Sequence, residues 1–176
     1  MPQDLPRVIL SRALLLGVAL TTLVGLVIWI APGSSASAST GVTFTVNSTG
    51  DGGDSYTGDG ICRDGAGKCT LRAAIQQAQS SGGLNTIAFK IPGRGPHTIQ
   101  PRSALPYITT PVIIDGYTQR WSKPNTNPPE LGTNAVLKIE LDGSLAGSPN
   151  VWGFLIVGGG STVRGLVINR FDRSAF

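Results

Sequence analysis

The stretch "CTLRAAIQQAQSSGG", residues 69–83, carries the clearest helical pattern of the chain. Its apolar side chains recur at the helical spacing i, i+3, i+4 and i+7, at Leu71, Ala74, Ile75 and Ala78. This spacing predicts an amphipathic helix of about ten residues that packs one face on a core and carries no chemistry. Thr70 stands at the expected N-cap, and Gly82 and Gly83 end the helix.

Cys62 and Cys69 are the only cysteines of the chain, and they lie just before this helix. We expect a disulfide between them, because the segment is predicted to face an oxidising compartment. A zinc site is a poor alternative, since zinc takes four ligands and the single histidine, His97, lies far along the chain.

The residues around the cysteine pair read "NSTGDGGDSYTGDGICRDGAGKC", residues 47–69. A segment so rich in Gly and Asp cannot pack a core, which predicts an exposed loop held by the disulfide. Oxygen-rich loops also bind calcium, the one cofactor that we consider, with Asp51, Asp54 and Asp59 as candidate ligands. The spacing differs from that of an EF-hand, so we favour a purely structural loop.

The first 38 residues have the features of an export signal. Arg7 and Arg12 precede the uncharged run 13–30, and Ala36-Ser37-Ala38 forms a small-residue cleavage site. The apolar run is also long enough for an uncleaved membrane anchor, which is the alternative. Both interpretations leave residues 39–176 outside the cytoplasm, either secreted, at the cell surface or anchored in the cytoplasmic membrane.

After Asn85 the sequence changes to short β-rich runs separated by turns. The runs are 86–91, 97–100, 111–116, 135–143, 153–159 and 161–171. Several end in Asp-Gly or Gly-Gly, as "VIIDG", "IELDG" and "LIVGG" do. Similar strands that end in tight turns suggest the rungs of a solenoid, and a β-sandwich is the alternative. In a solenoid, an amphipathic helix upstream of the first rung would cover its apolar end.

The segment Cys69-Thr70-Leu71-Arg72-Ala73-Ala74-Ile75 resembles the motif of exported bacterial proteins with a CSLREA domain. The flanks "FTVNSTGDGGD" and "NTIAFKIPG" are also similar, and the resemblance covers about residues 42–171. Ala73 stands where the family has Glu, and Gln79 where it has Asn. The resemblance implies an all-β fold, a right-handed parallel β-helix like that of pectate lyases, with the motif helix as its N-terminal cap.

Together these patterns predict three parts. Residues 1–38 are the signal peptide or membrane anchor, and residues 39–84 are an N-terminal cap with the disulfide loop and the helix. Residues 85–176 would build a short β-helix of about four coils. This last part ends without an evident cap, as a truncated chain would.

Three acidic residues, Asp115, Glu140 and Asp142, are the candidates for the carboxylate pair of a glycosidase. Asp115 and Asp142 stand in Asp-Gly turns, where Asp commonly bonds its own backbone, so we predict a turn role for both. Arg164 and Arg170 alternate with apolar residues and are interpreted as solvated positions. We therefore expect no catalytic residue and lean against an enzyme.

The loop 116–134 brings Tyr117 and Trp121 into a segment rich in Pro and Asn. These rings are candidate glycan contacts, and packing against the protein is the alternative. The net charge of +4 is spread singly, which argues against nucleic acid as a partner. We expect a non-enzymatic cell-surface or secreted scaffold or adhesion-type protein, with surface glycans as partners and a membrane contact through residues 13–30 if they are uncleaved. The alternative is a carbohydrate-active enzyme, a polysaccharide lyase or glycoside hydrolase, or an N-terminal fragment of one.

Overall fold

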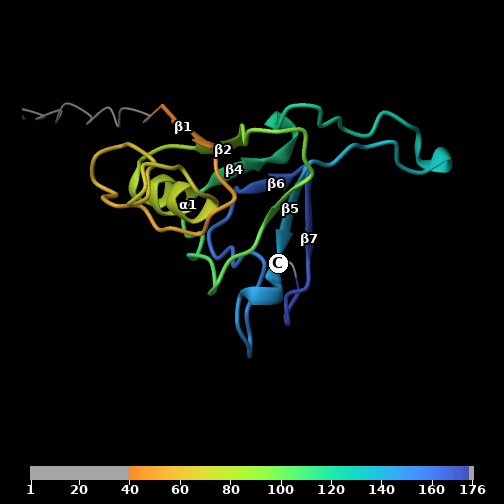
Figure 1. Cartoon of the computed structure of the whole chain (residues 1–176). Helices are drawn as coiled ribbons and strands as arrows, with labels where there is room; N and C mark the ends of the chain where they lie inside the picture. The colour runs from red at the N-terminus through yellow and green to blue at the C-terminus, as the bar shows by residue number, and fades with distance from the viewer. Residues whose placement is uncertain (1–39, 175–176) are drawn as a thin grey trace, which may run out of the picture. The chain divides into compact units, whose positions relative to one another are not determined.

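The computed structural model describes residues 40–174, which fall within one compact unit (Figure 1). The predicted signal segment lies outside the described residues. Within residues 40–174, no helix is long and apolar enough to span a membrane.

Two parallel β-sheets and one α-helix form the fold. The first sheet contains, in spatial order, β1 (Thr43–Val46), β2 (Asn85–Phe89), β4 (Val112–Asp115) and β6 (Thr162–Arg164). The second contains β3 (His97–Ile99), β5 (Ile139–Asp142) and β7 (Leu166–Asn169). The helix α1 is Leu71–Ser80, and the 3₁₀ turns are η1 (Gly116–Thr118), η2 (Pro129–Leu131) and η3 (Gly143–Leu145).

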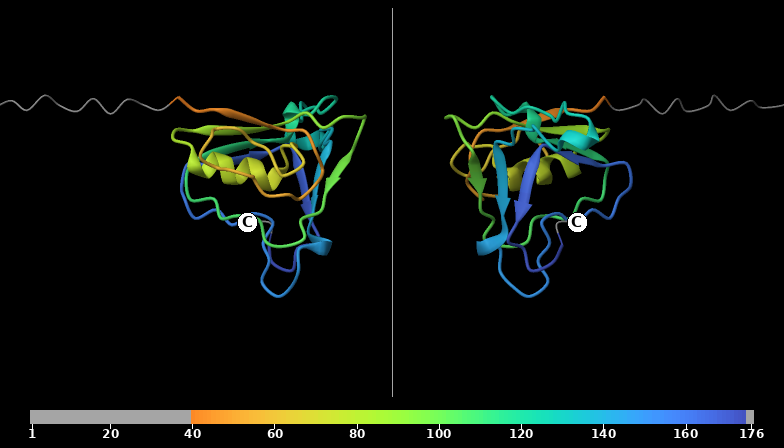
Figure 2. Two further views of the ribbon diagram at one scale, coloured as in Figure 1. Left: turned by 60° about the vertical axis from the view of Figure 1, so that its left-hand side comes forward. Right: turned by 90° about the vertical axis from the view of Figure 1, so that its right-hand side faces the viewer.

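From β2 onward the chain alternates between the two sheets, and each new strand pairs with the strand laid down one pass earlier. In the first sheet Ile87 stands beside Ile114, which stands beside Val163. In the second sheet Leu141 lies between Ile99 and Ile168. The two sheets run in different directions and meet at a corner, as the views of Figure 2 show. The connections that pass from the first sheet to the second therefore lie near one another at this corner, although they are far apart in the sequence.

The buried core is shared by the strands and the helix. The apolar face of α1, predicted from its spacing, is buried and packs in one cluster with inward-facing strand residues such as Val46, Ile87 and Leu141. The helix lies against β1 and β2, below the first sheet in Figures 1 and 2. The helix is present where the sequence predicts it, while its role as a cap stays a prediction.

The prediction of an all-β, right-handed parallel β-helix of about four coils is wrong. The described residues form a mixed fold of two parallel sheets and a helix whose apolar face belongs to the core. The run 153–159, expected as a strand, contributes only an isolated bridge between Ile156 and Ile108. Short apolar runs that end in Gly occur in any arrangement of parallel strands, so this pattern did not specify a coil repeat.

The run 161–171 also differs from its prediction, because it is two strands, β6 and β7, which belong to different sheets. Gly165 separates them with a φ of +74°, a conformation that glycine adopts without strain. Its α-carbon faces the backbone of Tyr117, where a side chain would collide. One glycine therefore takes the chain from the first sheet to the second.

The boundary predicted between residues 39–84 and 85–176 is crossed by regular structure. The strand β1, which the sequence did not reveal, pairs with β2 in register from Thr43 beside Thr86 to Val46 beside Phe89. The Asn85 side chain accepts a hydrogen bond from the Val42 amide at 2.9 Å and donates one to the Ala78 carbonyl at 2.9 Å. The segments before and after residue 84 are therefore bonded together at this point.

Candidate functional site

The outer face of the second sheet carries a polar network centred on β5. Thr98 of β3 and Asn169 of β7 both donate hydrogen bonds to the Glu140 carboxylate, each at 2.9 Å. Arg170, just after β7, donates to Glu140 Oε1 at 2.9 Å and to Asp142 Oδ1 at 2.7 Å. One guanidinium therefore bridges the two carboxylates of this face.

Asp142 and Asp115 have the same role at the ends of their strands. Each carboxylate accepts a hydrogen bond from the amide two residues later, that of Ser144 at 2.9 Å and that of Tyr117 at 3.0 Å. The turn role predicted for both residues is confirmed. Asp115 also forms an ion pair with Arg164 of β6 at 2.6 Å, so each aspartate links its turn to an arginine on the next pass of the chain.

Arg164 and Arg170, predicted to be solvated, are partly exposed but also form ion pairs. Their side chains are 57% and 54% exposed. Both are nevertheless held by carboxylates on neighbouring strands, because the parallel register places Asp115 beside Arg164 and Asp142 beside Asn169. The arginines therefore join strands across each sheet.

These contacts lower the pKa values of two carboxyl groups. The Arg170 guanidinium, followed by the Ser144 amide, holds the pKa of Asp142 far below its ordinary range. Hydrogen bonds from Asn169 and then Thr98 lower the pKa of Glu140. A glycosidase needs one carboxylic acid that stays protonated, which requires a raised pKa. Glu140 and Asp142 are ionised at neutral pH and do not fit this role.

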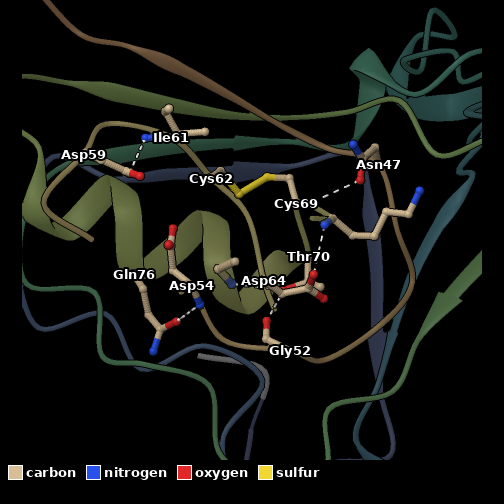
Figure 3. The surroundings of a disulfide bond; sticks show 12 residues. Asn47, Gly52, Asp54, Asp59, Ile61, Cys62, Asp64, Cys69, Thr70 and Gln76 are labelled. Carbon is tan, nitrogen blue, oxygen red and sulfur yellow. Dashed lines mark hydrogen bonds between the residues drawn. A yellow bond between two sulfur atoms is a disulfide. The ribbon is translucent and has the colours of Figure 1, made fainter. Parts of the chain in front are cut away.

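The loop between β1 and α1 wraps around the start of the helix and is tied to it (Figure 3). Thr70 accepts a hydrogen bond from the Ala73 amide at 3.0 Å and donates one to the Gly52 carbonyl at 2.5 Å. Gln76 accepts one from the Asp54 amide at 2.7 Å. Thr70 thus caps the helix, and Thr70 and Gln76 both attach the loop to it.

The predicted disulfide between Cys62 and Cys69 is present in this loop. Asn47 and Cys69 exchange two hydrogen bonds beside it: the Asn47 amide donates to the Cys69 carbonyl at 3.0 Å, and the Asn47 side chain accepts from the Cys69 amide at 3.1 Å. Inside the closed loop, Asp64 Oδ1 accepts hydrogen bonds from the Ala66 and Lys68 amides, both at 2.9 Å. The disulfide therefore closes a loop that is already folded by its own polar contacts.

The three calcium candidates each have partners within the protein. Asp51 binds Arg72 through both carboxylate oxygens, at 3.0 and 3.1 Å. Asp59 pairs with Arg63 at 2.8 Å, and Asp54 accepts a hydrogen bond from a nearby amide. Within residues 40–174, no three acidic, Cys or His side chains are grouped as a metal ion requires. Calcium binding stays a prediction from the sequence.

An open hollow of about 480 Å³ lies where the loop after β1 faces the second sheet. Its lining residues are Thr49, Gly50, Asp51, Gly52, Thr98, Gln100, Arg102 and Leu145. Several of its polar groups are already engaged: Asp51 binds Arg72, and Gln100 donates to Asp142 at 2.9 Å. The hollow offers hydroxyl and amide groups that are held in place by the neighbouring ion pairs.

A second pocket, of about 250 Å³, is lined by Arg94, Trp121 and Lys138. Trp121 is 44% exposed, and the guanidinium carbons of Arg94 and Arg120 lie 5.7 and 4.7 Å from its ring centroid. Both distances are within the range of cation–π contacts. Arg94 comes from the β2–β3 connection, Trp121 from the β4–β5 connection, and Lys138 directly precedes β5. The pocket therefore lies at the corner between the two sheets.

Tyr117 and Trp121, the two candidate glycan contacts, have different environments. Tyr117 is partly buried, and its ring lies against Gly165, where an added β-carbon would come within 2.8 Å of the ring. Trp121 belongs to the connection between β4 and β5 and is 44% exposed. Trp121 lines the second pocket and Tyr117 does not, so the two rings do not meet at this site.

No protein-family model matches this chain, and no curated protein or solved structure does either.

Sequence reasoning missed three basic residues: Arg94 and Lys138, which line the second pocket, and Arg120, which lies over the Trp121 ring. Arg120 precedes Trp121 in "QRWSK", so this pair was visible as a basic residue beside an aromatic one. Arg94 and Lys138 reach the same place only through the stacking of β2 to β5, and no local pattern could have identified them.

Proposed function

We propose that this protein is an exported, non-enzymatic scaffold or adhesion-type protein of the cell surface or the extracellular space. Export is supported by the charge and hydropathy pattern of residues 1–38. The non-enzymatic scaffold role is supported by the ion pairs of the acidic side chains. Asp115, Glu140 and Asp142 are paired with arginines of adjoining strands, where they join the sheets.

A scaffold outside the cell must resist local unfolding of its loops. In the described part of the chain, the long loop before α1 is held by several contacts. The glycine-rich loop before α1 is closed by a disulfide and tied to the helix by several hydrogen bonds. Arg72 holds this loop through Asp51 and also donates to the Ala104 and Ser103 carbonyls at 2.8 and 3.0 Å. These contacts join the loop, the helix and the segment after β3.

The first experiment tests export. The full chain with a C-terminal tag is expressed in a bacterial host, and intact cells are treated with a protease that cannot cross the membrane. We expect the tag to be cleaved or to appear in the medium. The Leu15→Arg variant, which places a charge in the apolar run, should keep the tag protected inside the cell. A tag that is protected in the unmodified chain contradicts export.

The second experiment tests the absence of catalysis. The full chain is incubated with neutral and acidic polysaccharides, and the polymer length and the number of new reducing ends are measured. We expect neither to change. Depolymerisation that is lost in Asp142→Asn would overturn the proposal in favour of a carbohydrate-active enzyme.

A further inference from the structure

Trp121 is held in an unusual backbone conformation. Its φ is +66°, in the left-handed region that large side chains rarely adopt. Such strain persists only where the surrounding structure maintains it, and it is concentrated at functional sites. Here the neighbouring residues fix the bend: the Ser122 amide donates to the Gln119 carbonyl at 3.1 Å, and Lys123 forms two backbone hydrogen bonds with Val136. The conformation presents the indole in the pocket at the sheet corner.

Within residues 40–174, the basic residues around Trp121 form no ion pair with an acidic side chain. The ion pairs within residues 40–174 take up Arg63, Arg72, Arg164 and Arg170. Arg94, Arg120 and Lys138 belong to none of the ion pairs in that part of the chain. Two guanidinium groups thus lie over one exposed aromatic ring and a lysine lines the same pocket, whereas Arg164 and Arg170 are paired with carboxylates of the sheets.

This combination favours an anionic ligand with an apolar face. Guanidinium groups bind carboxylate and sulfate oxygens with paired hydrogen bonds, and the indole offers a flat apolar surface for stacking. The volume of about 250 Å³ is below the range typical of pockets for whole drug-sized molecules, so it suits one unit of a larger chain. Proteins that bind single-stranded nucleic acid stack several bases on several aromatic rings. This pocket has one aromatic residue in its lining, so it fits such a ligand less well.

We infer that Arg94, Arg120, Trp121 and Lys138 form a binding site for an acidic polysaccharide, one whose sugar units carry carboxylate or sulfate groups. This inference rests on the proposed function and names the ligand class of the adhesion surface. The sugar ring stacks on the indole, and its acidic group is bound by the guanidinium and ammonium groups around it.

The test uses three polymers with one backbone: dextran, carboxymethyl dextran and dextran sulfate. Dissociation constants of the purified full chain are measured by calorimetry in a mild non-ionic detergent, with single-stranded oligothymidylate as a fourth ligand. We expect both charged dextrans to bind and neutral dextran not to bind. Comparison of the two charged polymers distinguishes carboxylate from sulfate as the preferred group.

Two variants remove the proposed site and one serves as the matched control. Trp121→Gly removes the ring and suits a positive φ, and Arg94→Gln with Arg120→Gln removes two charges. The control, Lys68→Gln with Arg173→Gln, also removes two charges, one of them from an arginine that lies 6.0 Å from the Trp152 ring. We expect an affinity loss of about tenfold or more in the first two variants and less than about twofold in the control.

Three results would overturn the inference: equal affinity in the Trp121→Gly chain, equal loss in the control, or tighter binding of oligothymidylate than of the charged dextrans. If surface attachment or glycan binding persists in Trp121→Gly, the inference fails while the proposed function stands. If the chain stays in the cytoplasm or depolymerises polysaccharides, the proposed function fails, whatever the dextran affinities are.

Discussion

At the scale of single residues, the strand-end aspartates connect local and long-range structure. Asp142 caps η3 through the Ser144 amide and binds Arg170 across the sheet. Asp115 does the same at η1 with Tyr117 and Arg164. The donors around Asp142 favour its ionised form, so the contribution of this carboxylate to stability depends on pH.

Because the pKa of Asp142 is lowered by folding, we expect the protein to lose stability in acid. Its pKa in the folded protein lies below the ordinary value of 3.8, so the unfolded chain binds more protons between the two values. The stabilisation is complete above about pH 4 and is lost as the pH falls through the folded pKa. We expect the melting temperature, measured by calorimetry from pH 7 to 2, to fall steeply below pH 4.

Arg170→Met tests the cause of this dependence, because Arg170 is the largest contributor to the lowered pKa. We expect the variant to melt a few degrees lower at pH 7 and to show a shallower decline below pH 4. Arg102→Met serves as the control and should keep the original profile. An unchanged acid profile in Arg170→Met would show that the arginine does not hold the carboxylate.

The Thr70 hydroxyl is expected to stabilise the first turn of α1 by capping it. The side chain is buried, accepts from the Ala73 amide and donates to the Gly52 carbonyl. Thr70→Val keeps the volume but loses both bonds, and we expect a loss of about 1–2 kcal/mol in the free energy of unfolding, measured with urea. Thr70→Ser should retain most of the stability, and equal losses in both variants would contradict a role for the hydroxyl.

At the scale of elements, the disulfide loop and α1 form one structural unit. The bridge between Cys62 and Cys69 restricts the unfolded chain over a short loop, for which the chain-entropy estimate is about 2 kcal/mol. We expect Cys62→Ala with Cys69→Ala to be destabilised by about this amount in urea. A reductant should destabilise the original chain equally and leave the double variant unchanged, and an effect on the variant would point to another cause.

The connection between β6 and β7 depends on Gly165. In Gly165→Ala the new β-carbon would need a positive φ and would approach the Tyr117 amide nitrogen to 2.6 Å. Gly132→Ala is the matched control, because Gly132 has a φ of +66° but no atom near the new β-carbon. We expect about 1 kcal/mol of destabilisation in the control and clearly more in Gly165→Ala. Similar losses in a urea titration would mean that the contact with η1 is unimportant.

At the scale of the whole molecule, basic residues from two connections, β2–β3 and β4–β5, lie around Trp121 at the corner between the sheets. Because the proposed interaction with acidic polysaccharide is ionic, it should weaken with salt. We expect the affinity for dextran sulfate to fall progressively as NaCl is raised from low concentration to about 0.5 M, where the screening length is only a few ångströms. Salt-independent binding would indicate that the charges of Arg94, Arg120 and Lys138 are not used.

Several features were predictable because they depend on neighbours in the sequence. The helix repeats every 3.6 residues, Thr70 bonds an amide three residues later, and Asp115 and Asp142 bond amides two residues later. The disulfide also spans few residues. In each case the interacting groups are kept close by the chain itself, whatever the rest of the fold does.

The sequence by itself therefore determined the helix, its cap, the disulfide and the aspartate turns. Only the tertiary structure decided the two-sheet arrangement, the place of α1 in the core, and the pairing of Arg164 and Arg170 with carboxylates. It alone placed Arg94 and Lys138 beside Trp121. The physical reason is that these contacts depend on which strands pair and in what register, and an apolar run with a glycine at its end is compatible with many pairings.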